Sequence, residues 1–179
     1  DGVGNACDAD AYTALGAASL AIKDQDGAPD KRKVLVKIKD AALAGAGDPR
    51  SGDTTLVVFN PTSGQRQAFT LPATGWVGVG TPAGSKGYKY ADPDLTNGPC
   101  SKAQLKPGKL LKVQCKGAQI SYALSAPQGS MALTIAGGVG TYCASFSGAA
   151  VTKDTPATNG GAGAFQAKNA PAPATCTLP

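Results

Sequence analysis

Apolar and polar residues alternate along much of this chain, with the period of two that places successive side chains on opposite faces of a strand. The clearest run is 31–40, KRKVLVKIKD, where Val34, Val36 and Ile38 share one face and lysines flank Leu35 on the other. The one stretch of helical composition, 12–22, is interrupted by a glycine. Further short strands are predicted at 18–23, 54–60, 65–71, 131–135, 141–146, 149–152 and 164–168. The pattern therefore indicates an all-β protein.

A meander of three strands is predicted for the stretch 100–124. Its turn is Lys106-Pro107-Gly108-Lys109, because proline fixes φ near −65° and glycine supplies a positive φ. Alternation over 111–115 predicts the strand that follows this turn. Lys116-Gly117 then breaks the run, and renewed alternation over 120–124 predicts a third strand.

The cysteines indicate disulfides. Five are present, none forms a CxxC pair, and the chain has no histidine, so a zinc site is disfavoured. We expect Cys100 and Cys115 to clip the hairpin and Cys143 to pair with Cys176 by elimination, although the sequence leaves other connectivities open. Cys7 is then left as a free thiol or for a partner outside the chain. Disulfides favour an oxidising, extracellular setting.

Length and composition agree with one sandwich domain. The chain has 179 residues, of which 24 are Gly and 13 are Pro, and only 16% are charged. Many short strands joined by turns are typical of such a composition. We predict a disulfide-stapled antiparallel β-sandwich or jelly-roll-like fold at 17–168, preceded by an acidic segment at 1–16 and followed by an extended Pro/Ala tail at 169–179, which Cys176 pins.

The chain has no apolar run long enough to span a membrane, and it begins at Asp1 without a Met or an apolar leader. We therefore expect the mature part of a secreted, cell-surface protein.

The first ten residues, DGVGNACDAD, differ in composition from the rest, with aspartates and an asparagine spaced around glycines. Oxygen ligands at such spacing suit Ca²⁺. The run from Asp1 to Asp8 resembles the second half of a thrombospondin type 3 repeat, a calcium-binding motif. The resemblance implies that Asp1, the Val3 carbonyl, Asn5 and Asp8 bind calcium. A solvated acidic segment is the alternative.

From Lys33 onward, the runs NPTSG, AGSKGYKY, LKPGKLLKVQCKG and AKNAPAPATC also resemble an uncharacterised secreted bacterial β domain found downstream of such repeats. This resemblance implies location and architecture, and no activity.

Two sets of residues are candidates for ligand binding. Trp76, Tyr88 and Tyr90 lie close together among glycines and could stack on sugars, or they could pack in the core. The stripe Lys33, Lys37 and Lys39 could attract a polyanion, in keeping with the net charge of +5, or it could protect an edge strand from pairing with another sheet. No aromatic residues interleave with these lysines, so a nucleic-acid groove is not supported.

The sequence favours a non-catalytic function. Without histidine, Ser-His-Asp and Cys-His constellations are excluded, and neither SxxK nor GxSxG occurs. We expect a structural or adhesive surface domain that associates with copies of itself, as in a filament or surface layer, or with another surface protein, with calcium at its N-terminal edge. The alternative is a module that binds carbohydrate or a polyanion through the aromatic and lysine residues.

Overall fold

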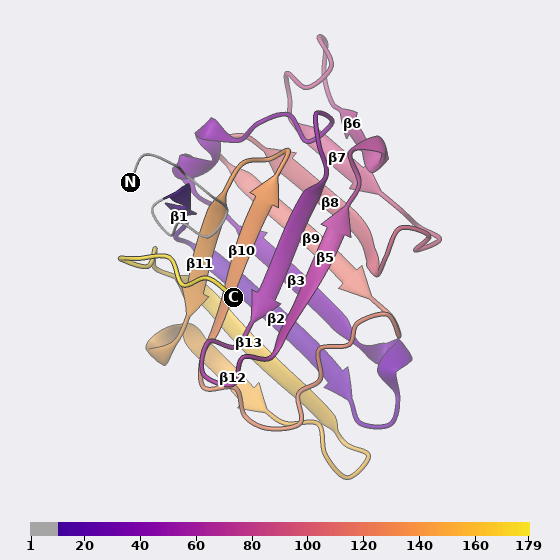
Figure 1. Cartoon of the computed structure of the whole chain (residues 1–179), viewed down its shortest axis with the longest axis vertical. Coiled ribbons are helices and arrows are strands. Elements are labelled where there is room, and N and C mark those ends of the chain that lie inside the picture. Colours follow the sequence, from indigo (N-terminus) through magenta and orange to yellow (C-terminus); the bar gives the residue numbers. More distant parts are fainter. Residues whose placement is uncertain (1–10) are drawn as a thin grey trace.

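The computed structural model describes residues 11–179 as two β-sheets packed face to face, with no α-helix in that range (Figure 1). The first sheet, sheet A, has the order β1-β11-β10-β4-β5. Its strands are β1 (Thr13–Ala14), β4 (Thr54–Phe59), β5 (Arg66–Leu71), β10 (Met131–Gly137) and β11 (Tyr142–Phe146). All its pairs are antiparallel except β1 with β11.

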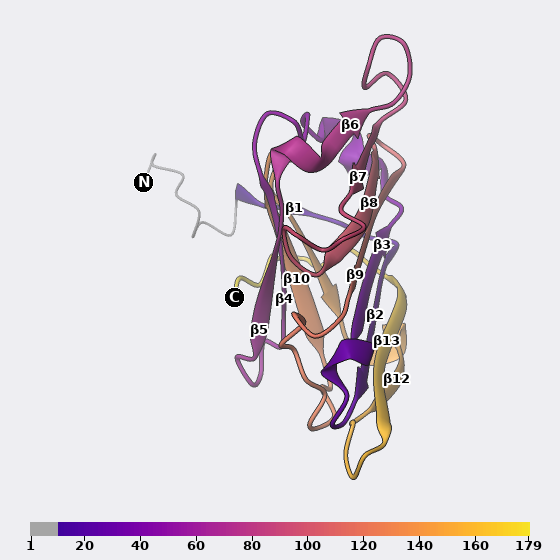
Figure 2. The same ribbon diagram turned by 90° about the vertical axis from the view of Figure 1, so that its right-hand side faces the viewer.

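The second sheet, sheet B, is larger and entirely antiparallel, with the order β12-β13-β2-β3-β9-β8-β7-β6. Its strands are β2 (Ala18–Gln25), β3 (Lys33–Ile38), β6 (Trp76–Gly78), β7 (Tyr88–Ala91), β8 (Cys100–Lys106), β9 (Leu110–Lys116), β12 (Val151–Thr155) and β13 (Ala162–Ala170). The side view shows the two layers, with the strands of sheet B on the right (Figure 2). The predicted all-β, disulfide-stapled sandwich is confirmed.

The core lies between the sheets and is formed by the apolar face of each alternating strand. On β3, Val34, Val36 and Ile38 are all buried, as the sequence pattern predicts. They pack in one cluster with residues of sheet A such as Leu56 and Leu133. The hairpin β8–β9 also forms as predicted, and its turn is closed by a hydrogen bond from Lys109 N–H to the Lys106 carbonyl.

The prediction of a third strand in the meander, over residues 120–124, is wrong. Residues 118–124 belong to no sheet, although Ile120, Tyr122 and Leu124 are at most 1% exposed. The alternation is real, because every second side chain enters the core. However, the backbone of this segment finds side-chain partners where a strand would have neighbouring strands.

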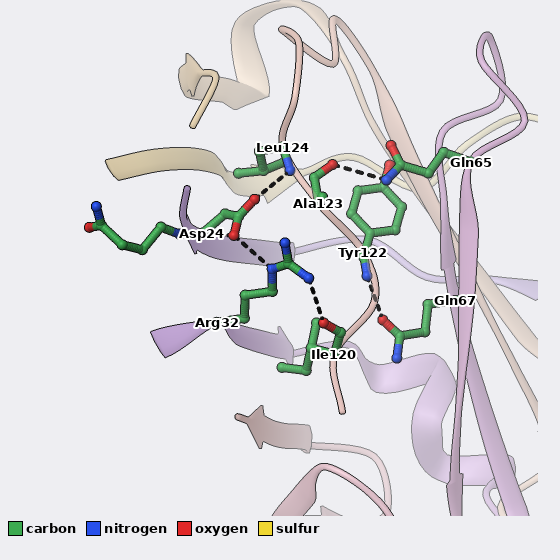
Figure 3. A network of polar contacts seen from close by, with 9 residues as sticks. Asp24, Arg32, Gln65, Gln67, Ile120, Tyr122, Ala123 and Leu124 are labelled. Carbon is green, nitrogen blue, oxygen red and sulfur yellow. Dashed lines mark hydrogen bonds and ion pairs between the residues drawn. The ribbon is translucent and has the colours of Figure 1, made fainter. Parts of the chain in front are cut away.

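Both sheets supply those partners (Figure 3). From the sheet B side, Asp24 of β2 accepts from Leu124 N–H at 2.8 Å, and Arg32, just before β3, donates to the Ile120 carbonyl at 3.0 Å. From the sheet A side, Gln67 of β5 accepts from Tyr122 N–H at 2.9 Å, and Gln65 donates to the Ala123 carbonyl at 2.9 Å. The segment therefore bridges the two sheets at the side of the sandwich.

Two disulfides form with the predicted pairing. The bond between Cys100 and Cys115 links two residues that pair directly across β8 and β9. Cys143 of β11 is bonded to Cys176, which ties the tail after β13 to sheet A. The chain's C-terminal end therefore lies on the sheet A side of the sandwich, away from sheet B (Figures 1 and 2).

Candidate polyanion-binding face

The outer face of sheet B carries most of the lysines of the chain. Because alternate residues of β2, β3, β7, β8, β9 and β13 are buried in the core, the residues between them point outward. We define the lysine face by the lysines at outward positions of sheet B: Lys23, Lys33, Lys37, Lys89, Lys102, Lys106, Lys112, Lys116, Lys153 and Lys168. No acidic residue occupies an outward position of these strands.

The strand register brings several of these lysines directly opposite one another. Lys33 of β3 faces Lys23 of β2 on one side and Lys116 of β9 on the other. Four residue pairs further along, Lys37 faces Lys112. Like charges in directly opposed positions repel and destabilise a sheet, by roughly 0.2–1 kcal/mol for each pair. The face therefore holds uncompensated positive charge.

Uncharged residues separate the two rows of lysines. Gln166, Ala21, Leu35 and Gln114 lie side by side across β13, β2, β3 and β9. All four are half-buried, whereas the lysines around them are mostly exposed. This uncharged row forms the floor of shallow depressions on the lysine face.

Most carboxylates from residue 11 onward are hydrogen-bonded away from the lysine face. Within residues 11–179, most aspartates accept hydrogen bonds from backbone N–H groups, and Asp30 and Asp94 are the exceptions. Asp154 of β12, for example, accepts from Gln128 N–H and Gly129 N–H. Across the same range, the ion pairs are Arg32–Asp24 and Arg50–Asp48, and neither includes a lysine.

For some of these aspartates, the hydrogen bonds lower the pKa. The hydrogen bond from Arg50 lowers the pKa of Asp48 to about 2, against the opposing effect of burial. Hydrogen bonds from the backbone of Asn97 and Thr96 lower the pKa of Asp92. Local hydrogen bonds therefore favour the charged form of Asp48 and Asp92, and both lie away from the lysine face.

The two predicted sets of ligand-binding residues lie in different environments. Trp76 and Tyr90 are only 4% and 2% exposed, and their ring centroids lie 5.6 Å apart in the core. Tyr88 is half-buried beneath Arg50, whose guanidinium lies 5.3 Å from the ring centroid. For Trp76 and Tyr90, burial favours the alternative of packing in the core, because these two rings offer no face to a ligand.

The predicted lysine stripe lies on the lysine face. Lys33 and Lys37 point outward from β3, and exposed Lys39 follows the end of this strand. The alternative of edge protection is wrong, because β3 pairs with β2 and β9 in the interior of sheet B. These lysines therefore do not guard an edge.

Sequence reasoning missed the lysines on the neighbouring strands. Lys112 and Lys116 alternate with the buried residues of β9, so their outward direction could be read from the sequence. The sequence does not show that β3 pairs with β9, because the two strands are far apart in sequence and local patterns do not indicate which distant strands pair. That pairing gathers the lysines on one surface.

The predicted calcium ligands Asp1, Val3, Asn5 and Asp8, and the unpaired Cys7, lie outside the described residues. From residue 11 onward, no group of three or more His, Cys, Asp or Glu side chains is placed to hold a metal ion.

None of the helical turns between residues 11 and 179 is long and apolar enough to cross a membrane. The two disulfides fit an extracellular protein. No match to this chain was found among protein-family models, curated proteins or solved structures.

Proposed function

We propose that this protein is a non-catalytic, secreted adhesive domain that holds acidic polymers through the lysine face. The observation that carries the proposal is the segregation of charge: ten lysines occupy outward positions of sheet B, and no carboxylate of residues 11–179 lies among them. A surface of one sign concentrates polymers of the opposite sign and accelerates their association.

Solubility alone is a weaker explanation for this surface. A soluble surface needs charges of both signs in alternation, and edge protection needs charge only on the outermost strands. Here the opposed lysines Lys33 and Lys116 lie on interior strands, where they repel one another. A bound polyanion would remove this repulsion, so binding and the relief of strain in the sheet are coupled.

The chemistry of the face favours an acidic polysaccharide over nucleic acid. Single-stranded nucleic acid is bound by aromatic side chains on which the bases stack, and the aromatic residues of β6 and β7 are turned inward. Arginine forms bidentate bonds with phosphate, and the described strands of sheet B contain no arginine. Lysines interleaved with glutamines suit scattered carboxylates and hydroxyl groups.

Removal of charge from the face tests the proposal. In the triple variant Lys33→Gln/Lys37→Gln/Lys112→Gln, we expect affinity for immobilised polygalacturonate to fall by about tenfold or more, which corresponds to ~1.4 kcal/mol. The matched control is Lys31→Gln/Lys86→Gln/Lys109→Gln, which removes the same charge from turns and loops. Binding would be measured by biolayer interferometry over a series of salt concentrations.

The control variant should retain most of the affinity of the wild type. An equal loss in both variants would show that only net charge matters, and no binding by the wild type to any acidic polymer in low salt would refute the proposal.

Self-association is a second proposed function, favoured by the edge of sheet A. Strand β5 is the last strand of this sheet, and Arg66 is its one charged residue. Exposed edges invite strand addition unless charge, proline or a bulge blocks it. We expect the protein to elute at a larger size as its concentration rises in size-exclusion chromatography. A chelator tests whether calcium at the N-terminal segment contributes, and a monomer at every concentration would oppose this function.

A further inference from the structure

We infer that the polymer is a single linear anionic polysaccharide that crosses the strands of sheet B along the uncharged row, between two walls of lysine. This inference rests on the proposed function and specifies the ligand and its direction. Three observations on the lysine face support it: the spacing of the rows, the continuity of the depressions, and the chemistry of the floor.

The rows have the dimensions of a channel. Side chains on one face of a strand recur every two residues, or about 6.6 Å. Lys23, Lys33 and Lys116 form one wall, Lys37 and Lys112 the other, and the uncharged row lies midway. The two lysine rows are four residues apart along each strand, so their backbone positions lie roughly 13 Å apart. The walls run across the strands, so a chain that keeps contact with both walls along its length lies in that direction.

The depressions on the face join into one trough. One, of about 330 Å³, lies beside Lys37 and Lys168, and a second, of about 340 Å³, lies beside Lys23 and Lys116. Both include Ala21 and Leu35 in their lining, so they meet on the floor.

A third depression, of about 410 Å³, shares Gln114 with the second and continues over β8 and β7 towards Lys89. Lys102 of β8 pairs with Gln114 and lines this third depression, so the uncharged floor ends at β9. The trough therefore extends from β13 to β7, with a lysine in its floor at β8. With strands about 4.8 Å apart, these six neighbouring strands span roughly 24 Å.

The floor offers what a sugar ring needs. Leu35 and Ala21 provide an apolar surface for the C–H groups of a pyranose, and Gln114 and Gln166 have amide groups that can donate to and accept from hydroxyls. Carboxylate or sulfate groups on either side of the chain reach the lysine walls. A duplex nucleic acid offers phosphates to the lysine walls but no pyranose face to the floor.

Filling the trough without a change in charge tests the inference. In Ala21→Tyr, the added ring occupies the floor, and we expect affinity for oligogalacturonates to fall by about tenfold. The matched control is Ala68→Tyr, the same substitution at an exposed position of β5 in sheet A. A second variant, Gln114→Ala, removes a floor amide without adding bulk and should weaken binding in the same direction. Circular dichroism and thermal melts would show that each variant is folded.

The length of the ligand gives an independent measurement. Affinity for a series of oligogalacturonates should rise with length and level off when the extended oligomer reaches about 24 Å. Sulfated oligosaccharides of equal length and charge show whether the lysines prefer sulfate or carboxylate groups. Duplex DNA and polyphosphate serve as competitors that carry negative charge but lack the hydroxyl groups of a pyranose chain.

The possible failures are distinct. If affinity follows charge density alone, with DNA and polyphosphate binding best and Ala21→Tyr without effect, the lysine face binds polyanions but the trough does not select a sugar chain. If the wild type binds none of these polymers, the proposed function fails as well.

Discussion

At the scale of single residues, aspartate and lysine divide the charged functions of this protein between them. Asp24 shows the structural use: one oxygen accepts from Arg32 Nε at 2.7 Å and the other from Leu124 N–H at 2.8 Å. The carboxylate thereby links β2 to the segment 118–124 that closes the sandwich. No lysine takes part in a comparable contact within the described chain.

Replacement of Asp24 should destabilise the fold strongly. In Asp24→Ala, the Arg32 guanidinium and the Leu124 N–H lose their partner in a buried setting, which costs about 3–5 kcal/mol. The free energy of unfolding would be measured by urea titration. Asp94→Ala, at an aspartate without such bonds, is the control and should change it little.

The same carboxylate should make stability depend on pH. Burial raises the pKa of Asp24, but the hydrogen bonds from Arg32 and the Leu124 N–H outweigh burial, and the pKa lies below its usual value. Its stabilising effect is therefore complete above the unfolded pKa of about 3.9 and is lost as the pH falls through the lower folded pKa.

We accordingly expect the wild-type melting temperature to fall below about pH 4, beyond the decrease seen in Asp24→Asn, where this titration is absent. Identical pH profiles for the two proteins would contradict this assignment.

Residue-scale prediction from the sequence succeeded where one rule was enough. A period of two correctly placed Val34 and Ile38 inside and Lys33 outside. The same rule placed Tyr88 and Tyr90 on one shared face, but it does not tell which face of a strand meets the core. Their strand pairs with β6 and β8, and the neighbours Trp76 and Ala103 are buried, so the tyrosines point inward.

At the scale of elements, the segment 118–124 shows how an alternating pattern can occur without a strand. Alternation requires only that every second side chain is buried. A strand also requires neighbours for its backbone, and here side chains of Asp24, Gln65 and Gln67 replace them. The sequence contains these residues, but it does not show that they meet a segment many residues away.

The hairpin disulfide gives a prediction for an element. Loss of the bond in Cys100→Ala/Cys115→Ala removes the constraint on a loop of 15 residues, which should lower the free energy of unfolding by about 3 kcal/mol. Chemical denaturation of the oxidised wild type and the double variant would measure the difference. A change well below 1 kcal/mol would mean that the turn at Pro107 and Gly108 alone fixes the hairpin.

The second disulfide controls the tail rather than the sandwich. In Cys143→Ala/Cys176→Ala, we expect residues after β13 to become sensitive to protease, because the tail is largely exposed and this bond ties it to β11. Limited proteolysis with mass spectrometry would locate the cleavage. The Cys100→Ala/Cys115→Ala variant should keep its tail protected.

At the scale of the whole molecule, the lysines that we propose for binding lower the stability of the unbound protein. Lys33 lies between Lys23 and Lys116 in the interior of sheet B, where like charges repel, and a bound polymer would offset this repulsion. The fold class and the disulfides could be predicted from local patterns. The lysine face could not, because it depends on the order of the strands in sheet B.

Salt should therefore stabilise this protein. Screening of the lysine repulsion raises the melting temperature between 20 mM and 500 mM sodium chloride, and Lys33→Gln raises it at low salt by an amount equivalent to roughly 0.2–1 kcal/mol for each relieved pair. Differential scanning fluorimetry would measure both. A melting temperature that falls with salt, or a Lys33→Gln variant less stable than the wild type, would show that the opposed lysines do not strain the sheet.

The bond between Cys143 and Cys176 also determines how the protein can be attached to a sensor or bead. A biotin added after Pro179 would sit on the sheet A side, so that sheet B remains open to the solution. Coupling through amines would instead modify the same lysines that we expect to hold the ligand. Orientation on the support should therefore decide whether adhesion is detected.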